Sequence, residues 1–195
     1  MSQTTIVATA TGPHLFWITS RAAGIAALLL SSVSVCAGLM MGGRMVRGRG
    51  RDRSADTRIS HEALSLATLG AIAIHGLALL GDGFMHPSLA DIAVPFVSGY
   101  RSLWTSAGIV AFWTLALLGL SFYLRSRIGV QRWRRLHRYA ALAWVLGVAH
   151  SLGEGTDAGQ AWFVAATAIV VLPALGLLVL RLSGLPGAPR REVTS

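Results

Sequence analysis

Charged residues are scarce in this 195-residue sequence, and one basic residue type is missing from it. Only 13% of the residues are charged, whereas 53% are hydrophobic. There is no lysine, so all 17 basic residues are arginine, against eight acidic ones. The mean hydropathy of +0.59 is too high for an ordinary soluble domain. We therefore expect one integral membrane domain with no soluble catalytic domain attached.

Cysteine is almost absent as well. The single cysteine, Cys36, excludes an internal disulfide and any zinc or iron–sulfur site built from cysteine thiolates. It lies within a long apolar run, where a small buried apolar residue is its expected role. The sequence also contains no G-x-G-x-x-G unit, so it offers no dinucleotide-binding fingerprint of that kind.

Long apolar runs are what the sequence does have, and five of them approach the roughly 20 residues needed to span a bilayer. They cover Leu15–Met41, Ile59–Gly81, Ser102–Leu124, Trp133–Leu152 and Ala161–Leu180. The predicted fold class is therefore all-α, an integral membrane bundle of five transmembrane helices. We expect one membrane domain over residues 15–181, an outer N-terminal tail over 1–14 and a cytoplasmic tail over 182–195.

The arginines alternate between the connecting segments. Six lie between the first two runs: Arg44, Arg47, Arg49, Arg51, Arg53 and Arg58. Six more lie between the third and fourth: Arg125, Arg127, Arg132, Arg134, Arg135 and Arg138. The other two loops carry Asp82, Asp91, Glu154 and Asp157, with Arg101 as their only arginine.

This alternation is the positive-inside pattern, which predicts a multi-pass protein of the cell (plasma or inner) membrane. It places the N-terminus outside and the C-terminus in the cytoplasm. We expect the positive charge to contact anionic lipid headgroups rather than nucleic acid. In the outer loop after the second run, apolar residues interrupted by Pro87 and Pro95 predict a short interfacial helix or cap.

Six histidines stand out against this apolar background. His14 and His86 lie near the edges of the predicted spans and are interpreted as interfacial residues. The other four form two pairs, His61 with His75 in the second run and His137 with His150 in the fourth. These two runs cross the membrane in the same direction, so His61 and His137 share an inner level. His75 and His150 share an outer level, roughly 20 Å away by helix rise.

Two imidazoles at one height on neighbouring helices are what a b-type haem requires. Imidazole is a good iron ligand, and the flat macrocycle fits between helices in the core of a bundle. Ionisable side chains at membrane depth also indicate function by default. We therefore expect two haems, an inner one on His61 and His137 and an outer one on His75 and His150. Proton relay or simple packing are the alternatives.

The helical geometry of the two histidine-bearing runs differs. Fourteen residues turn an ideal helix through about 1400°, about 40° short of four turns, so His61 and His75 share a face. Thirteen residues give about 1300°, which leaves His137 and His150 roughly 140° apart. Local overwinding, bending near Gly147 or different angles of ligand approach would each make up the difference.

The histidine pattern resembles that of the ferric reductase-like transmembrane domain family. This family includes NADPH oxidases, iron and copper reductases, and the haem subunit of the bacterial methionine sulfoxide reductase system. The resemblance rests on H-x13-H in one span and H-x12-H two spans later, preceded by "WRRL". The segments "SRAAGIAALLL" and "HSLGEGTD" add to it, and it extends from about Phe16 to Leu180.

The resemblance implies the same inner and outer haem ligands, and it adds arginine contacts. An arginine in the span before the first histidine helix matches Arg21, which would pair with a propionate of the outer haem. Snorkelling of Arg21 to the membrane interface is the alternative. Arg58, Arg135 and Arg138 would serve the inner haem in the same way.

The chain departs from the family in two respects. Many relatives continue into a flavin- and NADPH-binding domain, and the family has one further span before the first one seen here. We therefore expect an oxidoreductase component that receives electrons from a separate flavin reductase or from quinol. It would pass them to an acceptor, such as a protein, on the outer face.

Two other classes of function stay open. One is a haem-binding sensor or assembly subunit that does not turn over. The other is a transporter whose intramembrane histidines relay protons or coordinate a metal ion.

Overall fold

The computed structural model describes residues 3–42, 51–83 and 85–183, and within them helix is the only regular secondary structure. The helices are α1 (Gln3–Gly42), α2 (Arg51–Leu79), α3 (Leu89–Ala93), α4 (Ser102–Leu120), the 3₁₀ helix η1 (Ser121–Leu124), α5 (Arg125–Ile128), α6 (Val130–His137), α7 (Ala140–Glu154) and α8 (Ala161–Leu182).

The two predicted tails are described only in part. The backbone of the N-terminal tail is helical from Gln3, where α1 begins. Most of the predicted C-terminal tail lies outside the described residues, as do Arg44, Arg47 and Arg49 of the first arginine-rich connection.

Four helical segments of the described chain are long and apolar enough to cross a membrane. They cover His14–Gly42, Ala55–Leu79, Ser102–Ile128 and Ala161–Leu182. Large apolar side chains on them remain exposed, as at Leu117 and Ile169. Outward-facing apolar side chains are what lipid requires, so the fold is that of a multi-pass, all-helical membrane protein.

The predicted fourth span is not one continuous helix. It is divided into α6 and α7, with Arg138 and Tyr139 in a turn between them. The amide of Tyr139 donates to the carbonyl of Leu136, and the amide of Ala141 donates to that of Arg138. These i→i−3 bonds turn the chain by about 120° per residue instead of about 100°. Local overwinding of this kind adds about 20° per residue and therefore reduces the angular gap between His137 and His150.

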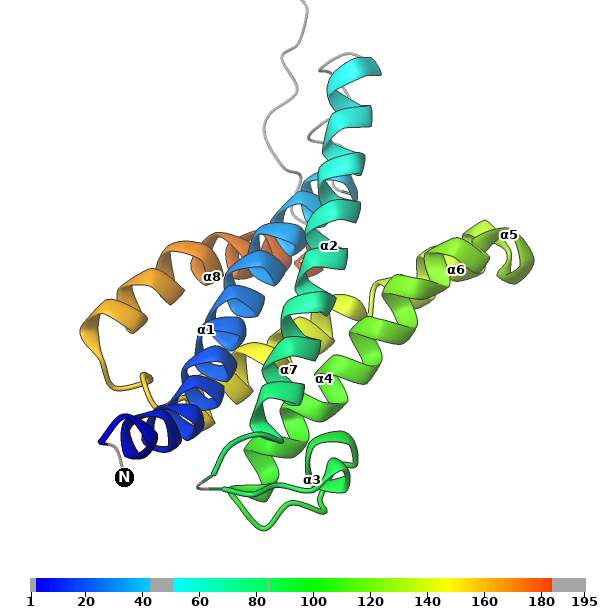
Figure 1. The fold of residues 1–195 in the computed structure, drawn as a ribbon. Coiled ribbons are helices and arrows are strands. Elements are labelled where there is room, and N and C mark those ends of the chain that lie inside the picture. The colour runs from blue at the N-terminus through cyan, green and yellow to red at the C-terminus, as the bar shows by residue number, and fades with distance from the viewer. Residues whose placement is uncertain (1–2, 43–50, 84, 184–195) are drawn as a thin grey trace, which may run out of the picture.

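The helices associate as two antiparallel pairs, α1 with α2 and α4 with α7, and α8 packs against α1 (Figure 1). A buried apolar cluster joins α1, α7 and α8, and it contains Leu28, Trp144, Phe163, Val171 and Ala174. The two pairs meet where α1 contacts α7 and where α2 contacts α4. The histidine-bearing helices α2 and α7 thus come from different pairs.

The short helix expected in the loop after the second span is present as α3. Ser88 caps it, since its hydroxyl accepts from the amide of Asp91 and the Asp91 carboxylate accepts from the Ser88 amide. Hydrogen bonds from the Ser88 hydroxyl and amide hold the pKa of Asp91 below its ordinary value. The indole of Trp113 on α4 donates to the carbonyl of Ala93, 2.8 Å away, which ties α3 to the bundle.

Candidate functional site

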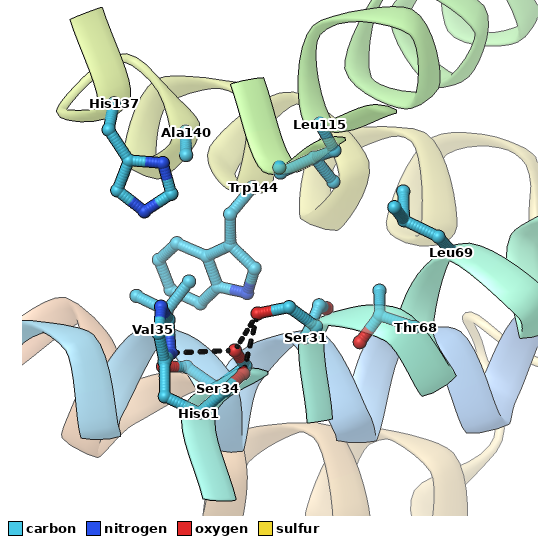
Figure 2. A pocket seen from close by; sticks show the side chains of 12 residues that line it. Ser31, Ser34, Val35, His61, Thr68, Leu69, Leu115, His137, Ala140 and Trp144 are labelled. Carbon is cyan, nitrogen blue, oxygen red and sulfur yellow. Dashed lines mark hydrogen bonds between the residues drawn. The ribbon is translucent and has the colours of Figure 1, made fainter. Parts of the chain in front are cut away.

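Four of the histidines lie in two close pairs, here called the inner pair and the outer pair after the levels predicted for them. In the inner pair, the ring centroids of His61 and His137 are 6.2 Å apart, with their planes at 86°. In the outer pair, those of His75 and His150 are also 6.2 Å apart, at 74°. Figure 2 shows His61 and His137 on opposite sides of a cavity.

The equal separations suit two imidazoles that share one metal ion. A metal–imidazole bond of about 2 Å, with about 1.1 Å from ring centroid to nitrogen, places the two centroids roughly 6 Å apart. In the part of the chain that the structure describes, no group of three or more His, Cys, Asp or Glu residues is placed to hold a bare metal ion. Each pair supplies two imidazole nitrogens, and a metal that takes two ligands from a protein and carries its others with it, such as a haem iron, matches that donor set.

The two histidines of α2 are held by the backbone of α1. Nδ1 of His75 lies 2.8 Å from the carbonyl oxygen of Ser20, and Nδ1 of His61 lies 2.9 Å from that of Ser34. A carbonyl oxygen only accepts, so each Nδ1 carries the hydrogen and Nε2 keeps its lone pair. This arrangement orients a histidine for ligation and raises the basicity of its free nitrogen.

The serine hydroxyls strengthen the same two anchors. The Ser20 hydroxyl donates to the carbonyl of His75 at 2.9 Å and lies 3.1 Å from its Nδ1. The Ser34 hydroxyl lies 3.0 Å from Nδ1 of His61 and 2.9 Å from the hydroxyl of Ser65. Each serine thus contacts its histidine through both backbone and side chain.

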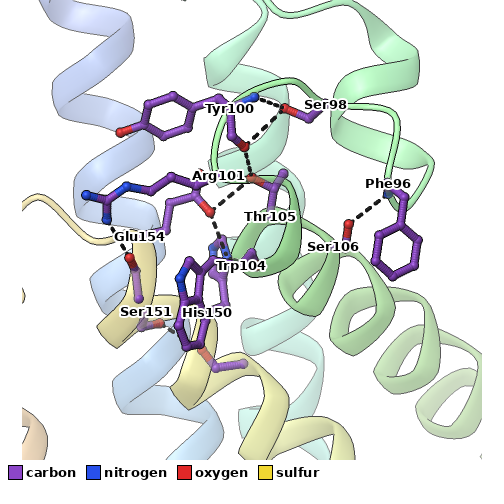
Figure 3. A network of polar contacts seen from close by, with 12 residues as sticks. Phe96, Ser98, Tyr100, Arg101, Trp104, Thr105, Ser106, His150, Ser151 and Glu154 are labelled. Atoms are coloured by element: carbon purple, nitrogen blue, oxygen red, sulfur yellow. Dashed lines mark hydrogen bonds and ion pairs between the residues drawn. The ribbon is translucent and has the colours of Figure 1, made fainter.

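His150 on α7 is held in the same manner by α4. Its Nδ1 lies 2.9 Å from the carbonyl oxygen of Trp104, and the carboxylate of Glu154 lies 3.8 Å from the same nitrogen. The hydroxyl of Thr105 donates to that carboxylate (Figure 3). The guanidinium of Arg101 donates to the carbonyl of Gly153 nearby. A polar network therefore surrounds the end of α7 beside His150.

His137 is held differently from the other three. Its Nδ1 is buried and lacks the short contact of 2.9 Å or less that the other three rings make with a carbonyl oxygen. The backbone carbonyl of Leu118 on α4 lies beside this nitrogen, as that of Trp104 does for His150. The ring stacks instead on the indole of Trp133, with centroids 4.8 Å apart and planes at 23°.

Three glycines allow the anchored rings to lie against the neighbouring helix. A Cβ atom at Gly24 would lie 3.0 Å from Nδ1 of His75, and one at Gly38 would lie 3.1 Å from Cε1 of His61. A Cβ atom at Gly108 would lie 2.7 Å from Nδ1 of His150. Each glycine comes one helical turn after the residue whose carbonyl accepts from that histidine. The absence of a side chain there permits the close approach.

Sequence reasoning missed these supporting residues, although a signal for them was present. The segments "SRAAG" and "SVCAG" repeat Ser-x3-Gly at a spacing of 14 residues, the same spacing as His61 and His75. Because α1 runs antiparallel to α2, one register places both serines and both glycines against the two histidines. A matched repeat on adjacent spans was therefore readable before the structure.

The cavity beside the inner pair is lined by polar and apolar groups of several helices. Its lining residues are Ser31, Ser34, Val35, His61, Ser65, Thr68, Leu69, Leu115, Gly119, His137, Ala140 and Trp144. The hydroxyls all come from α1 and α2. Trp144 is fully buried, and its Nε1 donates to the Ser32 hydroxyl at 3.1 Å.

Arg21 has a partner that sequence reasoning did not supply. Its guanidinium forms a two-pronged ion pair with the carboxylate of Asp157, with Nε 2.5 Å from Oδ2. Asp157 is buried in the loop between α7 and α8, and the guanidinium carbon also lies 5.1 Å from the ring centroid of Trp17. Because the adjacent Ser20 contacts His75, Arg21 lies at the level of the outer pair.

The other three predicted arginines are exposed. Arg58 lies on α2 just before His61, and Arg135 and Arg138 flank His137. Among the described residues, none of the three forms an ion pair with a carboxylate. In the sequence, all three lie close to His61 or His137, the two residues of the inner pair.

The two remaining histidines, His14 and His86, are exposed. Neither belongs to the inner pair or the outer pair.

Comparison of this chain with protein-family models, curated proteins and solved structures finds no match. The geometry of the histidine pairs is therefore the basis for assigning a function.

Proposed function

We propose that this chain is a dihaem b-type transmembrane electron-transfer protein, related to the ferric reductase-like transmembrane domains. The observation that supports this most directly is the occurrence of two imidazole pairs, each with centroids 6.2 Å apart. Three of the four rings have Nδ1 against a backbone carbonyl, which leaves Nε2 as the ligating atom. His61 and His137 would hold the inner haem, and His75 and His150 the outer one.

The proposed topology has five crossings. Four are the long apolar helices, and the fifth is formed jointly by α6 and α7, with its break toward the cytoplasmic surface. The arginine-rich connections between α1 and α2 and between α4 and α6 are cytoplasmic, and α3 and the α7–α8 loop are outside. With this orientation, His61 and His137 lie on the cytoplasmic side.

Each haem would supply a reversible one-electron couple when bound, and the residues of this chain hold and surround it. The two levels are separated by 14 residues of α2, about 21 Å of helix rise. Apolar helices surround both pairs, and the path between them would be costly for a charged carrier. An electron would thus cross the low-dielectric core without the diffusion of an ion.

Arginines are proposed to contact the haem propionates. Asp157 occupies Nε and Nη2 of Arg21, and a guanidinium has five N–H donors, so donors remain for an outer propionate. Arg58, Arg135 and Arg138 are proposed to serve the inner haem from the cytoplasmic side. Charge-assisted pairs of this kind would fix the orientation of each haem in its slot.

The electron donor is proposed to be a cytoplasmic flavin reductase or membrane quinol, and the acceptor lies on the outer face. The first test is the haem content of the purified protein by pyridine haemochrome analysis. We expect two b-type haems per chain. A protein without haem after expression with adequate haem supply would overturn the proposal and favour the transporter alternative.

The second test separates electron transfer from a sensor or assembly role. Purified protein in liposomes is reduced from one side by a flavin reductase, with ferricyanide enclosed on the other. Electron transfer predicts haem reduction followed by loss of ferricyanide at a rate proportional to the amount of protein. Stable haem reduction without ferricyanide loss would leave a haem-binding protein that does not carry electrons across.

A further inference from the structure

The connection between α4 and α7 carries charge of one sign only. Gly129, with φ at +92°, follows α5, and α6 then folds back beside the end of α4 (Figure 1). Residues 125–137 are here called the basic hairpin. From residue 121 to residue 153 the sequence contains no aspartate or glutamate. The basic hairpin contains five arginines: Arg125, Arg127, Arg132, Arg134 and Arg135.

Helix α6 of the basic hairpin separates apolar from charged side chains. Trp133 lies on the side that faces η1, where its indole donates to the Ser121 hydroxyl at 3.1 Å. A turn of about 100° per residue places Arg132, Arg134 and Arg135 away from that side. All three are exposed, and within the described parts of the chain none of them forms an ion pair with a carboxylate. Their charge is thus free for a partner outside the chain.

The length of the preceding span places the basic hairpin at the membrane surface. The helical segment Ser102–Ile128 has 27 residues, which is about 40 Å of helix rise. The hydrocarbon core of a bilayer is only about 30 Å thick. The end of this segment therefore reaches the layer of lipid headgroups, and in the proposed topology this layer is cytoplasmic.

The side chains of the basic hairpin match the headgroup of an anionic phospholipid. A guanidinium presents its N–H donors in a planar fork that pairs with two phosphate oxygens. Val130 and Leu136 lie on either side of Trp133 around α6, and both are exposed. Exposed apolar side chains beside a basic face suit the boundary between headgroups and acyl chains. A water-soluble acidic protein would leave them without an apolar partner.

α6 also carries one histidine of the inner pair. His137 is its last residue, and the ring stacks on the indole of Trp133 with centroids 4.8 Å apart. The i→i−3 turn through Arg138 and Tyr139 separates α6 from α7. A displacement of α6 would therefore move His137, whereas His150 on α7 would stay in place.

We propose that anionic phospholipid of the cytoplasmic leaflet binds the basic hairpin through Arg127, Arg132 and Arg134, and that this binding fixes α6 and the inner pair. Arg135 stays available for the inner propionate. The lipid site itself requires no haem. Its effect on the inner haem rests on the proposed function, because that haem would lie between His61 and His137.

The first experiment measures lipid preference without reference to haem. Purified protein is reconstituted with equal amounts of phosphatidylcholine and phosphatidylglycerol, and the lipids that it retains in detergent are counted by native mass spectrometry. We expect retention of phosphatidylglycerol over phosphatidylcholine. An arginine near an anionic surface contributes about a fivefold preference, so Arg132→Gln should lower this ratio severalfold. Arg132→Lys should keep the charge but lose the paired contact, and should give an intermediate ratio.

Gln131→Ala is the matched control, because Gln131 is exposed on the same helix and carries no charge. It should leave the ratio unchanged. Equal ratios for the unsubstituted protein and Arg132→Gln would overturn the proposal, and an acidic protein would then be the better candidate for these arginines.

The second experiment measures the effect on the inner pair. His75→Ala protein, which should hold the inner haem alone, is placed in nanodiscs of phosphatidylcholine with or without phosphatidylglycerol. Transfer of its haem to apomyoglobin should be severalfold faster without phosphatidylglycerol. His61→Ala protein, with the outer haem alone, should show equal rates. If either variant fails to fold, Arg132→Gln in the otherwise unsubstituted protein should speed the loss of one haem of the two.

The outcomes separate this inference from the proposed function. A clear preference for phosphatidylglycerol with equal rates of haem loss in both lipids would overturn the effect on the inner pair. A chain that holds no haem would overturn the proposed function instead, and the lipid ratios would still decide whether the basic hairpin is an anionic-lipid site.

Discussion

At the scale of single residues, the orientation of three of the paired histidines depends on contacts from a neighbouring helix. Ser20 and Ser34 fix two Nδ1 atoms through their carbonyl oxygens, and Trp104 fixes a third. A glycine one turn further along makes room for each of these rings. Several positions that determine the orientation of the imidazole rings are therefore not histidines, and they can be substituted while all four histidines are kept.

Gly108→Ala should lower the occupancy of the outer haem strongly while leaving the inner one nearly unchanged. A Cβ atom there would lie 2.7 Å from Nδ1 of His150, so the ring must move away from its carbonyl anchor. Gly76→Ala is the control on α2, because its Cβ would meet no atom within 4 Å. This substitution should only increase the helix propensity of α2. Haem content and the optical spectrum of each variant provide the measurement. Equal haem content in both variants would contradict the argument from close approach.

Arg21 and Asp157 should shift the potential of the outer haem in opposite directions. Arg21→Ala removes a cation that favours the reduced iron and should lower the potential, whereas Asp157→Asn leaves that cation uncompensated and should raise it. Each charge acts on the order of 1 kcal/mol over roughly 15 Å at an effective dielectric constant of about 20. Redox titration of each variant measures the shift, and the inner haem serves as internal control. Shifts of the same sign would contradict this electrostatic account.

The contact between Asp157 and Arg21 could not be predicted from the sequence alone. Its partner Arg21 is 136 residues away in the chain. The pairing exists because the α7–α8 loop folds against α1, which no local pattern reports. By contrast, the Ser-x3-Gly repeat of α1 was visible in the sequence, and only its match to His61 and His75 needed the structure.

At the scale of elements, hydropathy predicted four spans well because a long apolar run has few alternatives to a membrane helix. It did not predict the division of the fourth run into α6 and α7, because apolar composition says nothing about a change in hydrogen-bond pattern. The angular mismatch between His137 and His150 did indicate some irregularity, with overwinding among its causes. The structure places the overwound turn at Arg138 and Tyr139.

The pairing of the two α2 histidines with His137 of α6 and His150 of α7 predicts, under the proposed function, two haem layers that are lost separately. His75→Ala or His150→Ala should remove the outer haem and keep most of the inner one, and His61→Ala should do the converse. The reason is that each layer has its own two ligands, about 21 Å of helix rise apart. Haem stoichiometry and low-temperature optical spectra measure the losses. Loss of the same single haem in all three variants would contradict the two-layer arrangement.

At the scale of the whole molecule, the arginine distribution and the helix directions together predict which face of the protein is cytoplasmic. Thr156 is exposed in the α7–α8 loop, and Ser126 is exposed on α5 at the other end of the bundle. In a Cys36→Ala background, Thr156→Cys should react with an impermeant thiol reagent in intact cells, because its loop is outside. Ser126→Cys should react only after permeabilisation, because the arginine-rich connection is held on the cytoplasmic side. The reverse labelling would invert the topology, and His61 and His137 would then form the layer that faces the outer acceptor.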